Sequence, residues 1–348
     1  MTEVKRWLPT TALPTLALSA LALCAILIAG PARAQDPVDA AAAKKEGRAV
    51  WYTSTPVENA TRIARLFEAD TGIRIEVFRT GGSAVLRRFM QEIEAGRVLA
   101  DVLTTSDPGG FNALVKRGLL VPFKPAHWDK VPDVAKHTDG YWFAQRLNLM
   151  SIYLRSDKVA STDLPKTWDD LRAAKYKGRM VMTDPSYTSL QLSVVGTLAK
   201  VKGWGFYEAL RANDIMIVQG NQQVAENLRR GERVIAVGAS DSYATDDRQG
   251  GHPVTTILPE DGAFVIPSPT AVIKGSANPN SAKLFARFML TDDVQKLFPR
   301  EGGYGARTDM PPPANNPPLP QIKSIPIDYD YIEKEGSRIK RKFADVFQ

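Results

Sequence analysis

The sequence predicts an α/β fold with two lobes, and three observations support this prediction. Short apolar runs alternate with polar loops and amphipathic segments from residue 49 onward, which is typical of a mostly parallel sheet with helices between its strands. The same alternation starts again after residue 178. Two longer extended runs, 147–154 and 263–273, lie between these halves and are suited to join them as a hinge.

The first half contains three short apolar runs, and the first and third end directly in polar loops. Between them, apolar residues recur at helical spacing, for example Ile63, Leu66 and Phe67. We therefore expect strands at 49–52, 73–77 and 100–103, and helices around 63–67 and 83–93.

The second half repeats this order with different residues. The expected strands are 179–182, 215–218 and 234–237, with helices between them such as 224–230. The Pro-rich stretch 310–320 is expected to be irregular, and a basic amphipathic helix is expected from residue 331 onward.

The N-terminus has the pattern of a secretory signal peptide. Lys5 and Arg6 precede an uncharged apolar run at 16–28, and Ala32-Arg33-Ala34 has the small residues of a cleavage site. The apolar run is shorter than the roughly 20 residues that span a bilayer. We therefore expect residues 1–34 to be a cleaved signal and the mature chain to reside in the periplasm.

Composition narrows the function of the mature chain. Loss of residues 1–34 removes Lys5, Arg6, Arg33 and Glu3, so the formal charge of +7 falls to +5, scattered along the sequence. No basic cluster suggests nucleic-acid binding. Cys24 is the only cysteine, so the mature chain is expected to have no disulfide, thiol nucleophile or cysteine-bound metal.

A mature chain of some 300 residues exceeds one ordinary core, which also favours two lobes. We assign residues 35–148 plus 263–305 to lobe 1, and residues 149–262 plus 306–348 to lobe 2. We expect a monomer that needs no cofactor.

Hydroxyl-rich loops follow several of the predicted strands. The carboxyl ends of parallel strands are where ligands collect, because helix N-termini offer unpaired N–H groups and a dipole that favours anions. Ser and Thr hydroxyls add further donors there. The resulting candidate ligand-binding residues are Ser54, Thr55, Gly82, Ser83, Ser106, Asp107, Ser186, Tyr187, Thr188 and Ser189.

Two interpretations of these loops remain open. Ser and Thr are also the ordinary N-cap residues of helices, so one loop alone is explained by capping. The stretch 186–189 has four consecutive polar side chains, more than a cap needs, and similar loops recur at other strand ends. The set as a whole favours a ligand cleft.

Signals for catalysis are weak. His127, His137 and His252 lack metal-ligand spacing, and no nucleophile elbow, Walker loop or dinucleotide fingerprint occurs. No residue pattern places a nucleophile beside its base. A secreted enzyme or hydrolase on the same two-lobed frame remains the alternative of another class.

Several stretches resemble the periplasmic solute-binding proteins of ATP-driven (ABC) importers, in the branch described as ferric-iron binding. The similarity runs through residues 50–89, "ADVLTTSD" (100–107), "LVKRGLLVPF" (114–123), 164–186 and 259–290, in the order of that branch. The resemblance implies a type II periplasmic binding protein fold: two α/β lobes joined by two crossing strands, closing on a ligand in the interlobe cleft. It also implies a membrane permease as partner.

The iron ligands of that branch do not carry over to this sequence. The first loop has Thr55 where the resemblance implies a His, and the acidic position falls on Ser106 or Asp107. Only Tyr243 remains of an adjacent tyrosine pair. Iron(III) needs several anionic oxygen or imidazole donors, so we expect no metal site. Iron(III) with a synergistic anion remains the alternative ligand.

The anion-binding part of the family's site is matched better by this sequence than the iron ligands are. The resemblance places an anion at the helix N-terminus formed by 186–189, with Asn221 where one assisting Asn would fall. Asp241 lies near Tyr243 in the sequence, and both join the candidate site. We therefore expect a small organic anion, bearing phosphate or phosphonate, with an amine or hydroxyl groups.

Overall fold

The computed structural model describes residues 1–3 and 38–348. Most of the predicted signal peptide lies outside these residues. Residues 36–348 form one compact unit. In the described part of the chain, no helix is long and apolar enough to cross a membrane.

A single mixed sheet runs through this unit, in the strand order β2-β1-β3-β10-β5-β8-β6-β7. Strands β1, β2 and β3 are parallel, as are β6, β7 and β8, whereas β5 and β10 run antiparallel to their neighbours. The strands are β1 (Arg48–Thr53), β2 (Arg74–Arg79), β3 (Val102–Thr104), β4 (Leu120–Val121), β5 (Phe143–Arg155), β6 (Met180–Thr183), β7 (Met216–Val218), β8 (Ile235–Ser240), β9 (Val254–Ile257), β10 (Phe264–Ile273) and β11 (Tyr304–Gly305).

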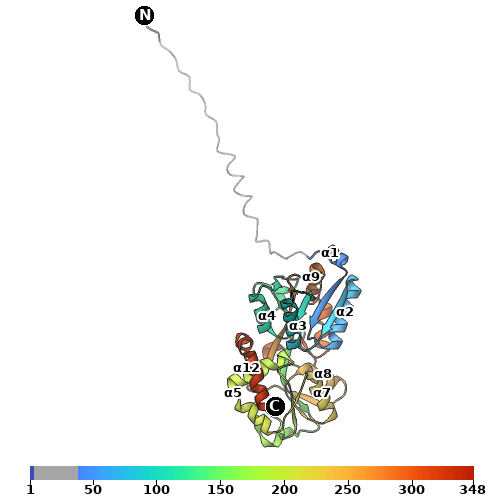
Figure 1. Ribbon diagram of the computed structural model, residues 1–348, viewed down its shortest axis with the longest axis vertical. Helices are drawn as coiled ribbons and strands as arrows, with labels where there is room; N and C mark the ends of the chain where they lie inside the picture. Colours follow the sequence, from blue (N-terminus) through green and yellow to red (C-terminus); the bar gives the residue numbers. More distant parts are fainter. Residues whose placement is uncertain (4–37) are drawn as a thin grey trace. The chain divides into compact units, whose positions relative to one another are not determined.

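Helices cover this sheet in two groups (Figure 1). The first group is α1 (Ala40–Glu46), α2 (Val57–Thr71), α3 (Gly82–Glu94), α4 (Pro108–Lys116) and α9 (Pro279–Phe288), with the short α10 (Asp292–Gln295) and α11 (Leu297–Arg300). The second is α5 (Ser189–Lys202), α6 (Gly205–Ala212), α7 (Asn221–Arg230), α8 (Asp241–Gln249) and α12 (Tyr329–Phe347). The strands expected from the sequence are present with shifted ends, and the α/β prediction is confirmed. The expectation of a mostly parallel sheet was wrong, because the crossing strands β5 and β10 pair antiparallel with their neighbours.

The crossing strands β5 and β10 join the two groups. They pair with each other, and β10 also pairs with β3 while β5 pairs with β8. The parallel trio on each side is thus hydrogen-bonded to a crossing strand. The extended runs in the sequence correctly predicted this connection.

Each group of helices has its own buried core. In lobe 1, Trp51, Phe67 and Phe285 pack edge to face, with ring centroids 5.1 Å apart. In the second core, Trp168 of lobe 2 packs on Phe264 of the crossing strand β10 at 5.6 Å. A fully buried aromatic side chain contributes about 1.5–3 kcal/mol, so each lobe has a substantial apolar core of its own.

The C-terminal segment contacts both cores. Ile322 packs in the lobe 1 cluster, whereas Ile332, Ile339 and Phe343 of α12 pack in the lobe 2 cluster. The apolar face of α12 is therefore used to dock the helix, as its sequence pattern suggests. The lobe boundaries given above stay a prediction.

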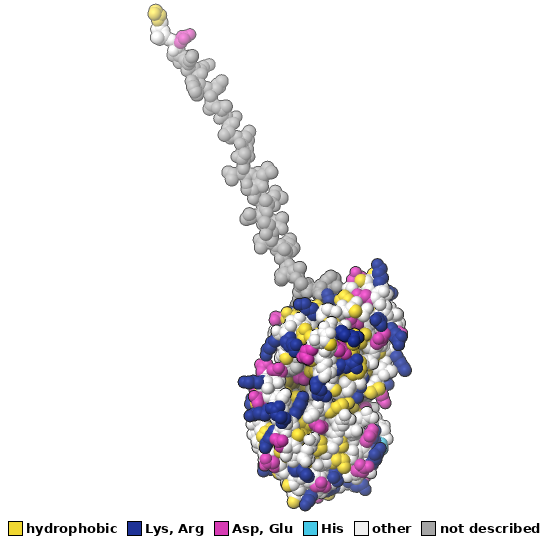
Figure 2. Space-filling view, in the orientation of Figure 1, with side chains coloured by type: hydrophobic (Ala, Val, Ile, Leu, Met, Phe, Trp, Pro, Cys, Tyr) yellow, Lys and Arg dark blue, Asp and Glu magenta, His cyan; other side chains and the backbone are white. Residues whose placement is uncertain are grey.

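The charged side chains of the face shown in Figure 2 are mixed, with Lys and Arg interspersed among Asp and Glu. This agrees with the scattered charge of the sequence.

Candidate functional site

The carboxyl ends of the six parallel strands meet at one polar cleft of about 290 Å³. Lobe 1 contributes residues that follow or end β1, β2 and β3, and lobe 2 contributes residues that follow or end β6, β7 and β8. The cleft is lined by Ser54, Pro56, Arg79, Gly81, Gly82, Ser106, Arg146, Asn148, Tyr187, Thr188, Ser189, Leu190, Gln219, Gly220, Asn221, Gln222, Gln223, Glu226, Ser240, Ser242 and Tyr243. This is the place where ligands bind in open parallel α/β sheets.

Two arginines give the cleft its positive charge. Arg79 is the last residue of β2, and Arg146 lies on the crossing strand β5 with only 6% of its surface exposed. Burial, together with the nearby charge of Arg79, lowers the pKa of Arg146 to about 10. The guanidinium is still charged near neutral pH. Glu226 is the single acidic residue among those that line the cleft.

Arg146 has unused hydrogen-bonding capacity. Its Nε is buried and has no hydrogen-bond partner in the described structure. A buried, unpaired polar group costs about 1–3 kcal/mol, and more when it is charged. An anion in the cleft would relieve this cost.

Five helices begin at the cleft, and none is capped by its N-cap side chain. These are α2, α3, α5, α7 and α8, whose N-cap residues are Pro56, Gly81, Thr188, Gly220 and Ser240. By contrast, α4 and α12 are capped by Asp107 and Asp328. The first N–H groups of an uncapped helix lack partners, and its dipole favours an anion. The cleft therefore combines several anion-attracting helix ends.

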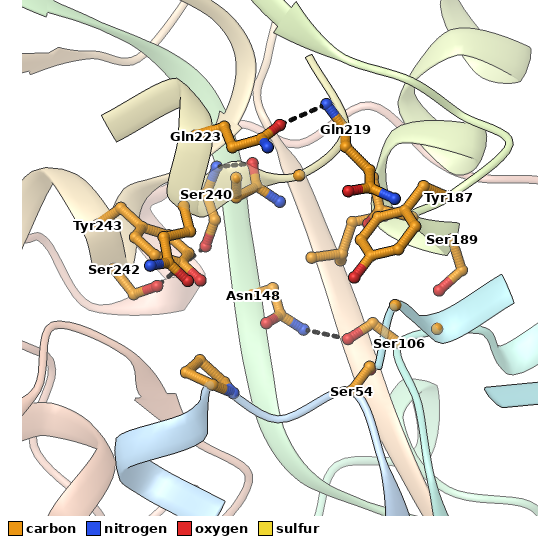
Figure 3. A pocket seen from close by; sticks show the side chains of 18 of the residues that line it. Ser54, Ser106, Asn148, Tyr187, Ser189, Gln219, Gln223, Ser240, Ser242 and Tyr243 are labelled. Carbon is orange, nitrogen blue, oxygen red and sulfur yellow. Dashed lines mark hydrogen bonds between the residues drawn. The ribbon is translucent and has the colours of Figure 1, made fainter. Parts of the chain in front are cut away.

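Neutral polar side chains form much of the remaining wall (Figure 3). Asn148 of β5 donates to Ser106 Oγ at 3.2 Å, as Figure 3 shows. It also donates to Ser268 Oγ at 2.8 Å. On the lobe 2 side, the Ser240 N–H donates to Asn221 Oδ1 at 3.3 Å, and the Gln219 N–H donates to Gln223 Oε1 at 2.8 Å. These bonds hold amides and hydroxyls at the wall of the cleft.

Tyr243 lines the same cleft as the two arginines. Burial raises the pKa of its phenol, although the charges of Arg79 and Arg146 act in the opposite direction. The neutral phenol is thus favoured near pH 7. It can donate or accept one hydrogen bond.

Eight residues expected from the sequence line the cleft together. They are Ser54, Gly82, Ser106, Tyr187, Thr188, Ser189, Asn221 and Tyr243. They follow six different strands, so the structure brings them together from positions far apart in the chain.

The other five expected residues do not line the cleft. Thr55 is buried and its Oγ1 bonds with Thr53 and Gln145. Asp107 caps α4 by accepting from the Gly110 N–H at 2.9 Å. Asp241 is buried and accepts hydrogen bonds from Thr256 and Asn316. Ser83 is buried in α3, and Ser186 is exposed. For Asp107, the structure therefore supports the interpretation as a helix cap rather than as a ligand-binding residue.

Sequence reasoning missed the two arginines, Asn148 and the glutamines of the cleft. Arg79 and Arg146 lie in strands that alternate or are continuously buried, where a basic residue gives no distinct signal. Gln219, Gln222 and Gln223 sit around the start of α7, where their composition resembles an ordinary helix surface. One signal was available: a charged residue inside the crossing strand is unusual, because buried arginines are rare without partners.

Metal ligation has little support in the described part of the chain, where no group of three or more His, Cys, Asp or Glu side chains could hold a metal ion. At the cleft, Glu226, Tyr187 and Tyr243 are the side chains able to present an anionic oxygen.

A family model described as "Bacterial extracellular solute-binding protein" matches residues 98–335, which is more than half of the chain. The chain belongs to this family. The fold and the resemblance stated from the sequence are confirmed by this match. Members of such a family bind a substrate, and catalysis is not their usual role.

Curated relatives of this solute-binding protein differ in their named roles. The phosphoglycerate transport regulatory protein PgtC of Salmonella typhimurium is 25% identical over 278 residues, covering 76% of this chain and 67% of its own length. Iron uptake protein A2 of Synechocystis is 26% identical over 248 residues, covering 66% of each. A probable ABC transporter periplasmic-binding protein, y4fP of Sinorhizobium fredii, is 24% identical over 280 residues, covering 75% and 76%.

Solved structures share the architecture. The periplasmic binding protein AfuA of Actinobacillus pleuropneumoniae, with exogenous fructose-6-phosphate bound, superposes with a TM-score of 0.77 at 21% identity, covering 86% of this chain and 98% of that one. Iron-bound HitA of Pseudomonas aeruginosa gives 0.75 at 21% identity, covering 85% and 99%. The solute-binding protein thus has the two-lobed type II periplasmic binding fold.

Proposed function

We propose that this protein is the periplasmic solute-binding component of an ABC importer and captures a small organic anion that bears a phosphate or phosphonate group. Bound ligand favours the closed arrangement of the two lobes, which the membrane permease then recognises. Binding and delivery involve no turnover of the ligand.

One observation carries the anionic part of this proposal. Arg79 and the buried Arg146 face the same cleft as five helix N-termini that lack side-chain caps. The planar guanidinium groups of the arginines and the free backbone N–H groups can together donate hydrogen bonds to the several oxygens of a phosphoryl group. A neutral solute would leave this charge without a partner.

The rest of the cleft supports an organic substituent on that anion. Asn148, Ser106 and the glutamines near α7 offer both donors and acceptors, which suit hydroxyl groups. Glu226 offers an acceptor for an amine. Asp241, which the sequence suggested for this role, is engaged elsewhere. The structural neighbour AfuA was solved with fructose-6-phosphate bound, and the relative PgtC is a phosphoglycerate transport regulatory protein, which supports the same class.

The periplasmic location rests on the sequence pattern at residues 1–34 and on the extracellular character of the family. N-terminal sequencing of secreted protein should find Gln35 as the first residue. A mature chain that retains residues 1–34 would contradict the signal peptide.

The ligand can be identified directly. Protein purified from the periplasm without denaturation should release a phosphorus-containing anion that mass spectrometry detects. Calorimetry should then show that this compound binds and that its dephosphorylated counterpart does not. A neutral or cationic solute bound with full affinity by Arg146→Gln protein would overturn the proposal.

A further inference from the structure

The two lobes meet where α3 begins. Gly81 is the N-cap of α3 in lobe 1, and it faces Tyr187 in the loop before α5 in lobe 2. A Cβ atom at Gly81 would lie 2.6 Å from the carbonyl oxygen of Tyr187 and 2.7 Å from its Cε1. These separations are far below the 3.5–4.0 Å at which carbon atoms make favourable contacts. The lobes approach this closely only because residue 81 has no side chain.

Backbone conformation does not explain this glycine. Gly81 has φ −64° and ψ 147°, an extended conformation open to any L-residue. Serine is at least as good as glycine at an N-cap position. The requirement for glycine therefore comes from the opposite lobe rather than from the helix that it begins.

Gly82 makes a similar but more forgiving contact. A Cβ atom there would lie 2.4 Å from Ser189 Oγ, yet 3.4 Å from Ser189 Cβ. The serine hydroxyl can rotate to another staggered position, whereas the Tyr187 carbonyl cannot move without its backbone. Position 81 therefore tolerates an added side chain less well than position 82.

The same helix makes another bond to this loop. Arg87 Nη1 of α3 donates to the carbonyl oxygen of Ser186 at 3.2 Å. Gly81, Gly82, Tyr187 and Ser189 also line the ligand cleft. The same residues therefore form both the interlobe contact and part of the cleft wall. The distance between the lobes at this contact sets the width of the cleft.

We infer that Gly81 sets how far the two lobes can close, and that any side chain at this position holds the ligand cleft open. This inference rests on the solute-binding function proposed above but not on the identity of the ligand. Gly81 is a positioning residue, because it acts through the approach of Tyr187 and the helix ends.

The test is a cross-linking rate measured without ligand. Arg87→Cys and Ser186→Cys place a thiol on each lobe at two exposed positions beside the contact. Cys24→Ala removes the only native cysteine of the full chain. A short bifunctional maleimide then links the lobes at a rate proportional to the closed population.

Into this background we introduce Gly81→Ser, which keeps a good N-cap residue but adds a Cβ. The control is Gly205→Ser, since Gly205 also lies at a helix start but has nothing within 4 Å of its Cβ position. We expect Gly81→Ser to slow cross-linking at least tenfold with an unchanged melting temperature, and Gly205→Ser to leave the rate unchanged. Gly82→Ala should have a smaller effect, which Ser189→Ala relieves.

Equal rates in Gly81→Ser and the parent protein would overturn the inference, and so would a parent protein that never cross-links. Inorganic phosphate and glycerol 3-phosphate, added as probes, report separately on the proposed ligand class. If neither accelerates cross-linking of the parent protein, the phosphate proposal loses support. The ligand-free rates still decide the role of Gly81.

Discussion

Arg79 donates a hydrogen bond of 3.1 Å from its Nε to the backbone carbonyl oxygen of Thr55. The bond ties the end of β2 to the loop after β1, so it fixes the guanidinium at the cleft. The two terminal nitrogens remain available to a ligand. Thr55, which the sequence suggested as a ligand-binding residue, therefore acts through its backbone.

Arg79→Gln should weaken binding of the anionic ligand. The loss of one charge-assisted interaction costs roughly 1.5–3 kcal/mol, or about tenfold or more in Kd. Arg74→Gln is the matched control, because Arg74 begins the same strand and is exposed. Calorimetry on both variants checks this expectation. Equal losses in the two would show that only general electrostatic attraction is involved.

The N-terminus of α5 separates capping from ligand binding. Thr188 is the N-cap residue of α5 but makes no side-chain capping bond. The double change Thr188→Ala with Ser189→Ala should therefore reduce ligand affinity at least tenfold with little change in the apo melting temperature. Ser186→Ala is the control, since Ser186 is exposed and does not line the cleft. A stability loss of about 1 kcal/mol with intact affinity would restore the capping interpretation.

Ferric iron should not form a coloured complex with this protein. Iron(III) needs several anionic oxygen or imidazole ligands, and burial raises the pKa of Tyr243, which disfavours the tyrosinate. Addition of ferric citrate should therefore produce no visible tyrosinate-to-iron band in absorption spectra. One tightly bound iron per chain would revive the alternative of iron(III) with a synergistic anion.

Asp246 should make stability depend on pH. Desolvation and the nearby carboxylates of Glu301 and Glu58 raise the pKa of Asp246 to about 7. With respect to Asp246, the free energy of unfolding is therefore highest below the unfolded pKa of about 4, where the carboxyl is protonated in both states. It falls as the pH rises through about 7, where the folded protein must also give up this proton. Asp246→Asn should match the parent protein near pH 4 and be more stable at pH 8.

Because part of the Asp246 side chain is exposed, solvent screening should keep this difference small. Thermal unfolding of the two proteins between pH 4 and pH 8 provides the measurement. A difference in melting temperature that stays constant over this range would contradict the assignment.

The sequence alone predicted the order of strands and helices and the two crossing strands. It could do so because apolar periodicity is local, and because β5 and β10 are long extended runs with no helical spacing. The recurrence of hydroxyl-rich loops after strands also predicted where a ligand would lie. Ser54, Ser106, Tyr187 and Thr188 all reach the cleft for this reason.

Only the tertiary structure decided which polar residues face that cleft. Asp107 and Thr188 look alike as loop residues before a helix, yet Asp107 bonds to its own helix and Thr188 does not. The direction of a side chain depends on which elements pack beside it, and this information is spread over the whole chain. Arg146 illustrates the same point, because three strands separate β5 from β2 in the sheet and only the folded chain places Arg146 and Arg79 at the same cleft. The role of Gly81 was equally invisible in the sequence, since its ordinary backbone angles conceal a constraint imposed by the opposite lobe.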